Sequence, residues 1–204
     1  PCPTPLYHAE GALLLEYLPG HPTAAPEDAD SFIQQIACLL ASVHNVPIDR
    51  FQFLPRLPTE IQPTLRPPNE ALRESEIRAR LDAVRLDVRC DQCLLHGDLW
   101  PGNILWDAGT LAGVIDWENA AIGPAIADLA ICRLDLMWVL GRSAMEIFTS
   151  RYLSVNPIDV EALAYWDLRA ALRPMEAVDL WAEPYAELGR PDIDADHMRN
   201  VLIE

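Results

Sequence analysis

The sequence predicts an α+β fold, namely a mainly helical domain built around a small β-hairpin. Apolar residues recur at three- and four-residue spacing over residues 31–44, and the chain reads as helical from residue 125 to its end. Between these regions, two short apolar runs flank the turn-forming tetrapeptide Asp107–Thr110, a pattern typical of a hairpin. Half of the 204 residues are apolar, which is enough to form one sizeable core.

The N-terminal part is expected to contain a strand and a helix. Residues 11–18 read as a mostly buried strand, which Pro19-Gly20 ends. The next element is the helix of residues 31–44, whose first turn Asp30 or Ser31 can cap.

A proline-rich stretch and a second helix follow. Residues 47–68 contain six prolines and are expected to be irregular. Asn69 can cap the helix after them. Its expected apolar stripe consists of Ile77, Leu81, Val84 and Val88.

The rest of the chain is predicted to be helical after Gly123-Pro124. The expected breaks lie near Gly141, Asn156-Pro157, Pro174 and Gly189-Arg190-Pro191. Residues 125–140 are apolar on nearly all sides but carry three charges, which would be costly in lipid. This segment is therefore expected to be a buried helix of the protein interior.

Charge excludes several classes of partner. The chain has 15 Lys and Arg against 31 Asp and Glu, a formal net charge of −16, and every one of the 15 is Arg. A nucleic acid or an anionic membrane surface is not expected as a partner, because phosphate groups require basic patches. No apolar run reaches the roughly 18 residues of a bilayer span.

Five cysteines form an odd set in a chain too large to need disulfides, so a reducing compartment, the cytoplasm, is expected. Cys90-Asp91-Gln92-Cys93 has the C-x-x-C form of a metal or redox site. Without a second ligand pair, two structural thiols at a strand entry are the favoured interpretation.

The hairpin organises the candidate site. Its strands are expected at residues 104–106 and 111–115, which brings Asn103 and Asp116 to the same end, next to Asp98 in the preceding loop. Carboxylate and amide oxygens suit Mg²⁺, and a further carboxylate can take the proton of a hydroxyl, as phosphoryl transfer requires. Taken singly, Asp98 could cap a turn and Asn103 could satisfy backbone groups. The three together favour the functional interpretation.

Several segments resemble one known family in order and spacing. The segment His96–Leu105 (HGDLWPGNIL) resembles the catalytic loop of the aminoglycoside phosphotransferase/choline kinase-like family, and Val114–Glu118 (VIDWE) resembles its metal-binding segment. Gly123-Pro124 with Asp128-Leu129-Ala130 resembles the start of its next helix, and Leu15–Gly20 resembles its interlobe hinge. The resemblance covers essentially the whole chain and implies a protein-kinase-like fold.

The resemblance also implies residue roles. Asp98 would be the catalytic base, and Asn103 and Asp116 would hold Mg²⁺. The remaining implied roles are loop bracing by His96 and Asp128 and nucleotide binding by Glu16, Leu18, Leu105 and Ile115. ATP is the implied phosphoryl donor, and GTP is not excluded.

The chain departs from the family pattern at its N-terminal side. Such kinases carry a small β-rich lobe with a phosphate-binding lysine before the hinge, whereas this chain begins about ten residues before the hinge strand and has no lysine. Residues 1–20 are therefore expected to be a remnant of the small lobe and hinge, and residues 21–204 the large lobe. A fragment of a longer enzyme is the favoured interpretation and a natural truncation the alternative, and the isolated chain is expected to be inactive and to bind ATP weakly.

The leading functional hypothesis is an ATP-dependent phosphotransferase that acts on a hydroxyl of a small molecule. A catalytically inactive kinase-like binding module is the competing hypothesis. A Mg²⁺-dependent phosphohydrolase is a third, disfavoured because the further carboxylates of a two-metal site are not seen.

The acceptor and the oligomeric state are left open by the sequence. An acidic C-terminal region suggests a cationic acceptor such as an aminoglycoside. Its acids are Glu176, Asp179, Glu183, Glu187, Asp192, Asp194 and Asp196. Macrolides, choline-like amines, sugars and amino-alcohols remain open as acceptors. The loop Asp98–Asn103 is also similar to that of ketosamine kinases, whose acceptor is a glycated amine.

Overall fold

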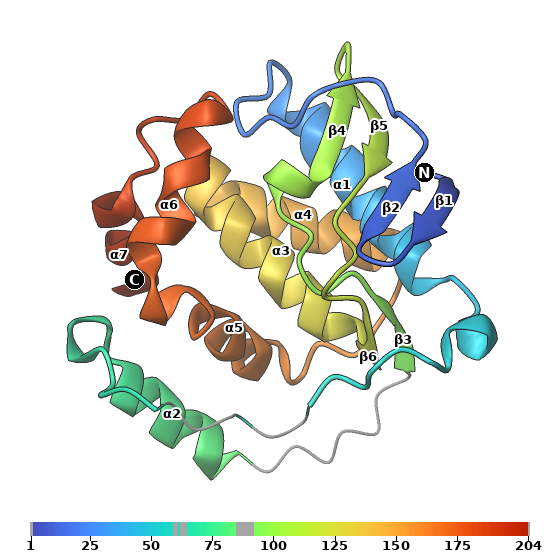
Figure 1. The fold of residues 1–204 in the computed structure, drawn as a ribbon. Coiled ribbons are helices and arrows are strands. Elements are labelled where there is room, and N and C mark those ends of the chain that lie inside the picture. The colour runs from blue at the N-terminus through green and yellow to red at the C-terminus, as the bar shows by residue number, and fades with distance from the viewer. Residues whose placement is uncertain (1, 59–60, 62–64, 85–91, 204) are drawn as a thin grey trace.

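The fold is a helical body with short strands on one side (Figure 1). The computed structural model describes residues 2–58, 61, 65–84 and 92–203. Its α-helices are α1 (Ala29–His44), α2 (Glu74–Ala83), α3 (Ala125–Leu140), α4 (Arg142–Val155), α5 (Leu163–Ala171), α6 (Val178–Glu187) and α7 (Ala195–Ile203). Its strands are β1 (Pro5–Ala9), β2 (Ala12–Leu15), β3 (Gln92–Leu95), β4 (Ile104–Asp107), β5 (Thr110–Val114) and β6 (Ala121–Pro124). Short 3₁₀ helices are η1 (Ile48–Phe51), η2 (Glu70–Leu72), η3 (Pro101–Asn103) and η4 (Pro174–Glu176). The α+β class predicted from the sequence is confirmed.

Helix α3 is the centre of the helical body and packs against α1, α4 and α5 (Figure 1). The expectation of a buried helix is confirmed, because most of its apolar residues and also Asp128 and Asp135 are shielded from water. In α4, Phe148 and Tyr152 are fully buried in the same core. Burying a side chain of this size contributes about 2–3 kcal/mol.

Helix α1 begins two residues earlier than predicted. The side chain of Asp28 accepts a hydrogen bond from the Ser31 N–H at 3.0 Å, so Asp28 is the N-cap. The expectation that Asp30 or Ser31 caps the helix is therefore wrong. Asp30 lies inside the first turn, where its negative charge still interacts favourably with the helix dipole.

The predicted buried strand at residues 11–18 is wrong in its burial and its length. Within residues 11–18, only the four residues of β2 form a strand, which pairs with β1 in an antiparallel hairpin. All four residues of β2 are exposed, because within the described residues the hairpin pairs with no other strand and no helix covers either face. The apolar residues of this segment therefore favour a strand, but the strand is not buried.

The hairpin of β4 and β5 is present as predicted, with Ile104 opposite Val114 and Asp107 opposite Thr110. Outside this hairpin, Trp106 of β4 also pairs with His21 through two backbone hydrogen bonds of 3.0 Å. Gly20, with a φ of +100°, permits this approach, because a Cβ there would lie 2.4 Å from the Trp106 carbonyl oxygen.

Strand β6 was not predicted. It pairs with β3, so that Cys93 lies opposite Gly123 and Leu95 opposite Ala121. In the sequence, the Gly-Pro at the end of β6 indicates a turn and not a strand. The segment is extended because it pairs with β3, about thirty residues earlier in the chain.

Helix α2 is shorter than predicted. It starts at Glu74, whose buried carboxylate accepts hydrogen bonds from the Asn69 N–H, Arg66 and Arg78. The helix ends at Ala83, and Val84 is extended and exposed. The expected side-chain cap by Asn69 and the continuation to Val84 are therefore wrong, and Val88 lies outside the described residues.

The Cys93 half of the C-x-x-C segment is a buried thiol, and Cys90 lies outside the described residues. The Cys93 thiol donates to the Gly123 carbonyl at 3.5 Å, and burial raises its pKa to about 12. Such a thiol is unreactive, which supports the structural interpretation of Cys93. Over the part of the chain that the structure describes, no helix combines the length and apolarity needed to cross a bilayer.

Candidate active site

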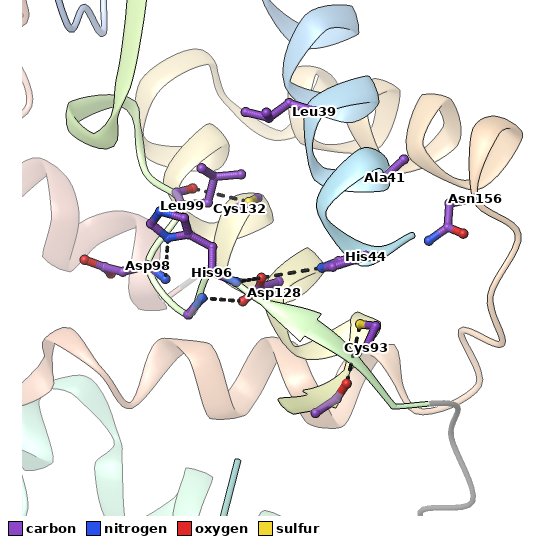
Figure 2. Close-up of polar contacts among 12 residues, drawn as sticks. Leu39, Ala41, His44, Cys93, His96, Asp98, Leu99, Asp128, Cys132 and Asn156 are labelled. Atoms are coloured by element: carbon purple, nitrogen blue, oxygen red, sulfur yellow. Dashed lines mark hydrogen bonds and ion pairs between the residues drawn. The ribbon is translucent and has the colours of Figure 1, made fainter. Parts of the chain in front are cut away.

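The loop from His96 to Asn103 connects β3 to β4 and is anchored by a buried carboxylate of α3 (Figure 2). Asp128 accepts hydrogen bonds from the backbone N–H groups of His96 at 2.7 Å and Gly97 at 3.0 Å. His44 of α1 contacts the same carboxylate at 3.4 Å. The first two residues of the loop are therefore fastened to α3, and α1 supports the carboxylate that holds them.

Gly97 is required at the bend of this loop. Its φ is +80°, and a Cβ would lie 2.2 Å from the Asn119 carbonyl oxygen. Glycine alone combines a left-handed conformation with so close an approach.

The His96 ring connects the loop to the segment after β5. It is fully buried, its Nε2 lies 3.1 Å from the Ile115 carbonyl, and its Nδ1 accepts from the Asp98 N–H at 3.3 Å. Burial lowers the pKa of His96, so the ring is neutral at physiological pH. A neutral ring with Nε2 protonated satisfies both contacts, which supports a bracing role and not proton transfer.

Asn103 and Asp116 lie at the same end of the β4–β5 hairpin. The Ile115 N–H donates to the Asn103 carbonyl at 3.0 Å, and the Asn103 side-chain amide donates to the Asp98 carbonyl at 2.9 Å. Because the amide nitrogen is thus used, the Asn103 side chain offers its oxygen to a ligand. Asp116 has a φ of +62°, a strained conformation of the kind that collects at functional sites.

The donor set fits Mg²⁺. The carboxylate of Asp116 and the amide oxygen of Asn103 are hard ligands, too few for a complete cage, so a bound ion would keep waters and substrate phosphates. Correspondingly, no group of three His, Cys, Asp or Glu among the described residues forms a ready metal site.

A buried network behind Asp128 was missed by sequence reasoning. The Tyr152 hydroxyl lies 2.6 Å from His44 Nδ1 and accepts from the Asn156 side-chain amide at 2.7 Å. His44 lies in α1, Tyr152 lies in α4, and Asn156 directly follows α4. In the sequence, only the polar character of these three residues could have pointed to the network. The hydrogen bond to Tyr152 holds the His44 ring with its other nitrogen toward Asp128, and Figure 2 shows this second contact.

Arg173 is a second residue that sequence reasoning missed. Its Nη2 lies 2.7 Å from the carboxylate of Asp98 and 3.1 Å from the Gly97 carbonyl, and its guanidinium lies 5.4 Å from the Trp181 ring centre. No local pattern marks this residue, which precedes η4 between two helices.

Asp98 and Arg173 line a cavity of about 340 Å³ between the His96–Asn103 loop and α6. The remaining lining residues are Trp100, Asn119, Asp135, Leu180, Trp181, Pro184 and Tyr185. Asp135 is 4% exposed and accepts a hydrogen bond from the Tyr185 hydroxyl at 3.4 Å. Burial raises the pKa of Asp135 to about 8. The seven acids of the C-terminal region do not line this cavity in the described structure.

The predicted nucleotide-binding residues lie on two segments. Leu105 and Ile115 are half-buried at the open face of the hairpin, whereas Ile104 and Val114 face the core. The backbone N–H of Glu16 donates to the Thr4 carbonyl at 2.8 Å. Because this N–H is used, Glu16 would bind a ligand through its backbone carbonyl. Leu18 is half-buried on the same segment.

The chain is similar in sequence to proteins of one known family. Residues 1–184 match the sequence model of a family described as the phosphotransferase enzyme family. An aminoglycoside 3'-phosphotransferase of Streptomyces fradiae is 28% identical over 179 residues, which are 76% of this chain and 66% of that protein. A homoserine kinase of Neisseria meningitidis serogroup B is 29% identical over 171 residues, which are 76% of this chain and 54% of that protein. The chain thus spans about half to two thirds of the length of these curated relatives.

Solved structures share the fold. The crystal structure of an aminoglycoside-3'-phosphotransferase of type VIII has a TM-score of 0.62 and 24% identity, over 82% of this chain and 72% of that one. The GDP complex of an aminoglycoside 2'-phosphotransferase-IIIa has a TM-score of 0.61 and 18% identity, over 98% of this chain and 76% of that one. The family resemblance and the kinase-like fold predicted from the sequence are confirmed.

Proposed function

Because this chain belongs to the phosphotransferase enzyme family, we propose that it transfers a phosphoryl group from a nucleotide to a hydroxyl of a small molecule. One observation carries the proposal. Asp98 and Asn103 share a loop whose first two residues are fastened by Asp128, and the His96 ring ties that loop to the segment that bears Asp116. Phosphoryl transfer depends on such positioning of acceptor and phosphate more than on covalent chemistry.

In the proposed reaction, Asp98 positions the acceptor hydroxyl and accepts its proton. The hydroxyl oxygen forms a bond to the γ-phosphorus while the bond to the leaving diphosphate oxygen breaks. His96 holds the Asp98 backbone N–H and stays neutral throughout.

Mg²⁺ is the cation we propose for Asn103 and Asp116. When bound, it would neutralise phosphate charge. The hydrogen bond from the Asn103 amide to the Asp98 carbonyl orients the metal-binding oxygen with respect to the catalytic loop.

ATP is the donor we propose, with GTP as the second candidate, since a related fold is solved as a GDP complex. The half-buried Leu105 and Ile115 would contact the base, and the backbone of Glu16 and Leu18 would bind its edge. In this proposal residues 1–20 serve the nucleotide side, and residues 21–204 carry the acceptor side and the catalytic loop.

The test is nucleotide-dependent phosphorylation by the product of the complete reading frame. The acceptor panel takes its members from the relatives, namely homoserine and an aminoglycoside. Asp98→Asn should lower kcat by about 10²–10⁴-fold, because the positioned base is lost. Asp107→Asn, in the exposed hairpin turn, removes a similar charge and should leave kcat unchanged.

An inactive binding module is the competing function. Calorimetric binding of Mg²⁺–ATP without turnover of any acceptor, and with Asp98→Asn indistinguishable from wild type, would support that module and contradict the phosphotransferase.

A further inference from the structure

The cavity beside Asp98 holds two further ionisable groups, one basic and one acidic. Arg173 and Asp135 both line it, and they come from different elements, the segment before η4 and the middle of α3. Both Arg173 and Asp98 interact electrostatically with Asp135. A ligand in this cavity therefore meets one cation and two carboxyl groups at once.

Arg173 has hydrogen-bond donors to spare. Its contacts with Asp98 and the Gly97 carbonyl both use Nη2, while Nε and Nη1 have no partner among the described residues. Trp181 supports the guanidinium plane at 5.4 Å. A fixed guanidinium with a free edge binds a carboxylate in a bidentate way.

Asp135 is the buried polar group of the same cavity. Its only hydrogen bond within the described structure is the long 3.4 Å contact from the Tyr185 hydroxyl. Burial disfavours the ionised form of this carboxyl group despite the favourable interaction with Arg173, and an ammonium group of a ligand would stabilise that form.

The aromatic walls limit the size of the ligand. Trp100 lies 5.5 Å from the Tyr185 ring, and Trp181 closes another side. A polycation placed here would meet the positive charge of Arg173, whereas a small ligand with both charges would satisfy both residues.

We propose that the acceptor is a small zwitterionic hydroxy-amine, an amino-acid-like alcohol, whose carboxylate binds Arg173, whose ammonium binds Asp135 and whose hydroxyl faces Asp98. This inference rests on the proposed phosphotransferase function. It assigns Arg173 and Asp135 as the residues that determine acceptor specificity.

The test compares matched ligands by calorimetry on the 204-residue chain, because every cavity residue belongs to it. L-homoserine carries both charges, aminopropanol lacks the carboxylate, γ-hydroxybutyrate lacks the amine, and kanamycin is a polycation. Homoserine should bind at least about tenfold more tightly than each of the others, since each lacks one charge-assisted contact.

Single substitutions should remove one preference each. Arg173→Gln should make homoserine and aminopropanol bind equally, and Arg173→Lys should restore part of the difference. Asp135→Asn should make homoserine and γ-hydroxybutyrate bind equally. Arg199→Gln and Asp196→Asn change the same charges at an exposed pair outside the cavity and should leave the order of affinities unchanged.

Two results would overturn the inference. One is equal or tighter binding of aminopropanol or kanamycin, or no binding of homoserine at millimolar concentration. The other is an Arg173→Gln variant that lowers turnover equally for all acceptors and keeps their relative affinities, which would assign Arg173 to the phosphoryl group. If the binding order holds but the complete gene product transfers no phosphate, the proposed function fails and the specificity assignment stands as a binding site.

Discussion

The guanidinium of Arg173 lies 2.7 Å from the carboxylate of Asp98, although the two residues are 75 positions apart in the sequence. The ion pair joins the His96–Asn103 loop to the segment between α5 and α6, beside the cavity that both residues line. Any movement of that segment is therefore transmitted directly to the proposed base.

Gly97 and Gly109 form a matched pair for testing the loop bend. Both have a positive φ, +80° and +76°, but only Gly97 has an atom in the way of a Cβ. Gly109→Ala should cost about 1–2 kcal/mol of unfolding free energy, the strain of a left-handed alanine. Gly97→Ala should cost at least about 2 kcal/mol more, because the chain must also shift away from Asn119. Urea denaturation measures both, and equal losses would show that the close approach at Gly97 is not limiting.

Tyr152 is expected to stabilise the fold through its hydroxyl. Tyr152→Phe leaves His44 Nδ1 and the Asn156 amide without their partner, which should cost about 1–3 kcal/mol in the free energy of unfolding. Tyr165→Phe removes a hydroxyl from a half-buried ring on α5 and is the control. Thermal and urea unfolding report the difference, and two variants of equal stability would argue against the network.

Asp135 predicts a pH dependence of stability. Its pKa is raised from 3.8 to about 8 in the folded protein, so between these values the native state keeps a proton that the unfolded chain releases. The native state then binds more protons, and stability falls as pH rises, by up to about 1.4 kcal/mol per pH unit. Asp98, Arg173 and Tyr185 are the charged or titratable groups that act on it.

Asp135→Asn mimics the protonated form and should lack this loss. Its stability relative to wild type should improve steadily from about pH 4 to about pH 8, as followed by urea unfolding. Asp196→Asn, on the exposed face of α7, should show no such trend. A constant difference between Asp135→Asn and wild type would contradict the raised pKa.

The β1–β2 hairpin predicts self-association. Tyr7 and Leu14 face each other across the strands and are 63% and 58% exposed. An exposed apolar ribbon with unpaired edges invites contact with a second chain. Sedimentation should show concentration-dependent association that Leu14→Thr weakens, whereas Val155→Thr on α4 should not. A monomer at all concentrations would refute this expectation.

The sequence by itself determined the features that depend on neighbours along the chain. The loop from His96 to Asn103, the hairpin that follows it and the helical character after residue 125 all rest on short-range spacing and turn chemistry. These local patterns were sufficient to identify the family and the residues Asp98, Asn103 and Asp116 as the candidate site.

Only the tertiary structure decided what depends on contacts between distant segments. The pairing of β3 with β6, the exposure of residues 12–15 and the meeting of Arg173, Asp135 and Asp98 in one cavity have no local signature. The physical reason is that burial and ion pairing are set by which elements pack together, and α3 brings these groups together only when the helices close around it.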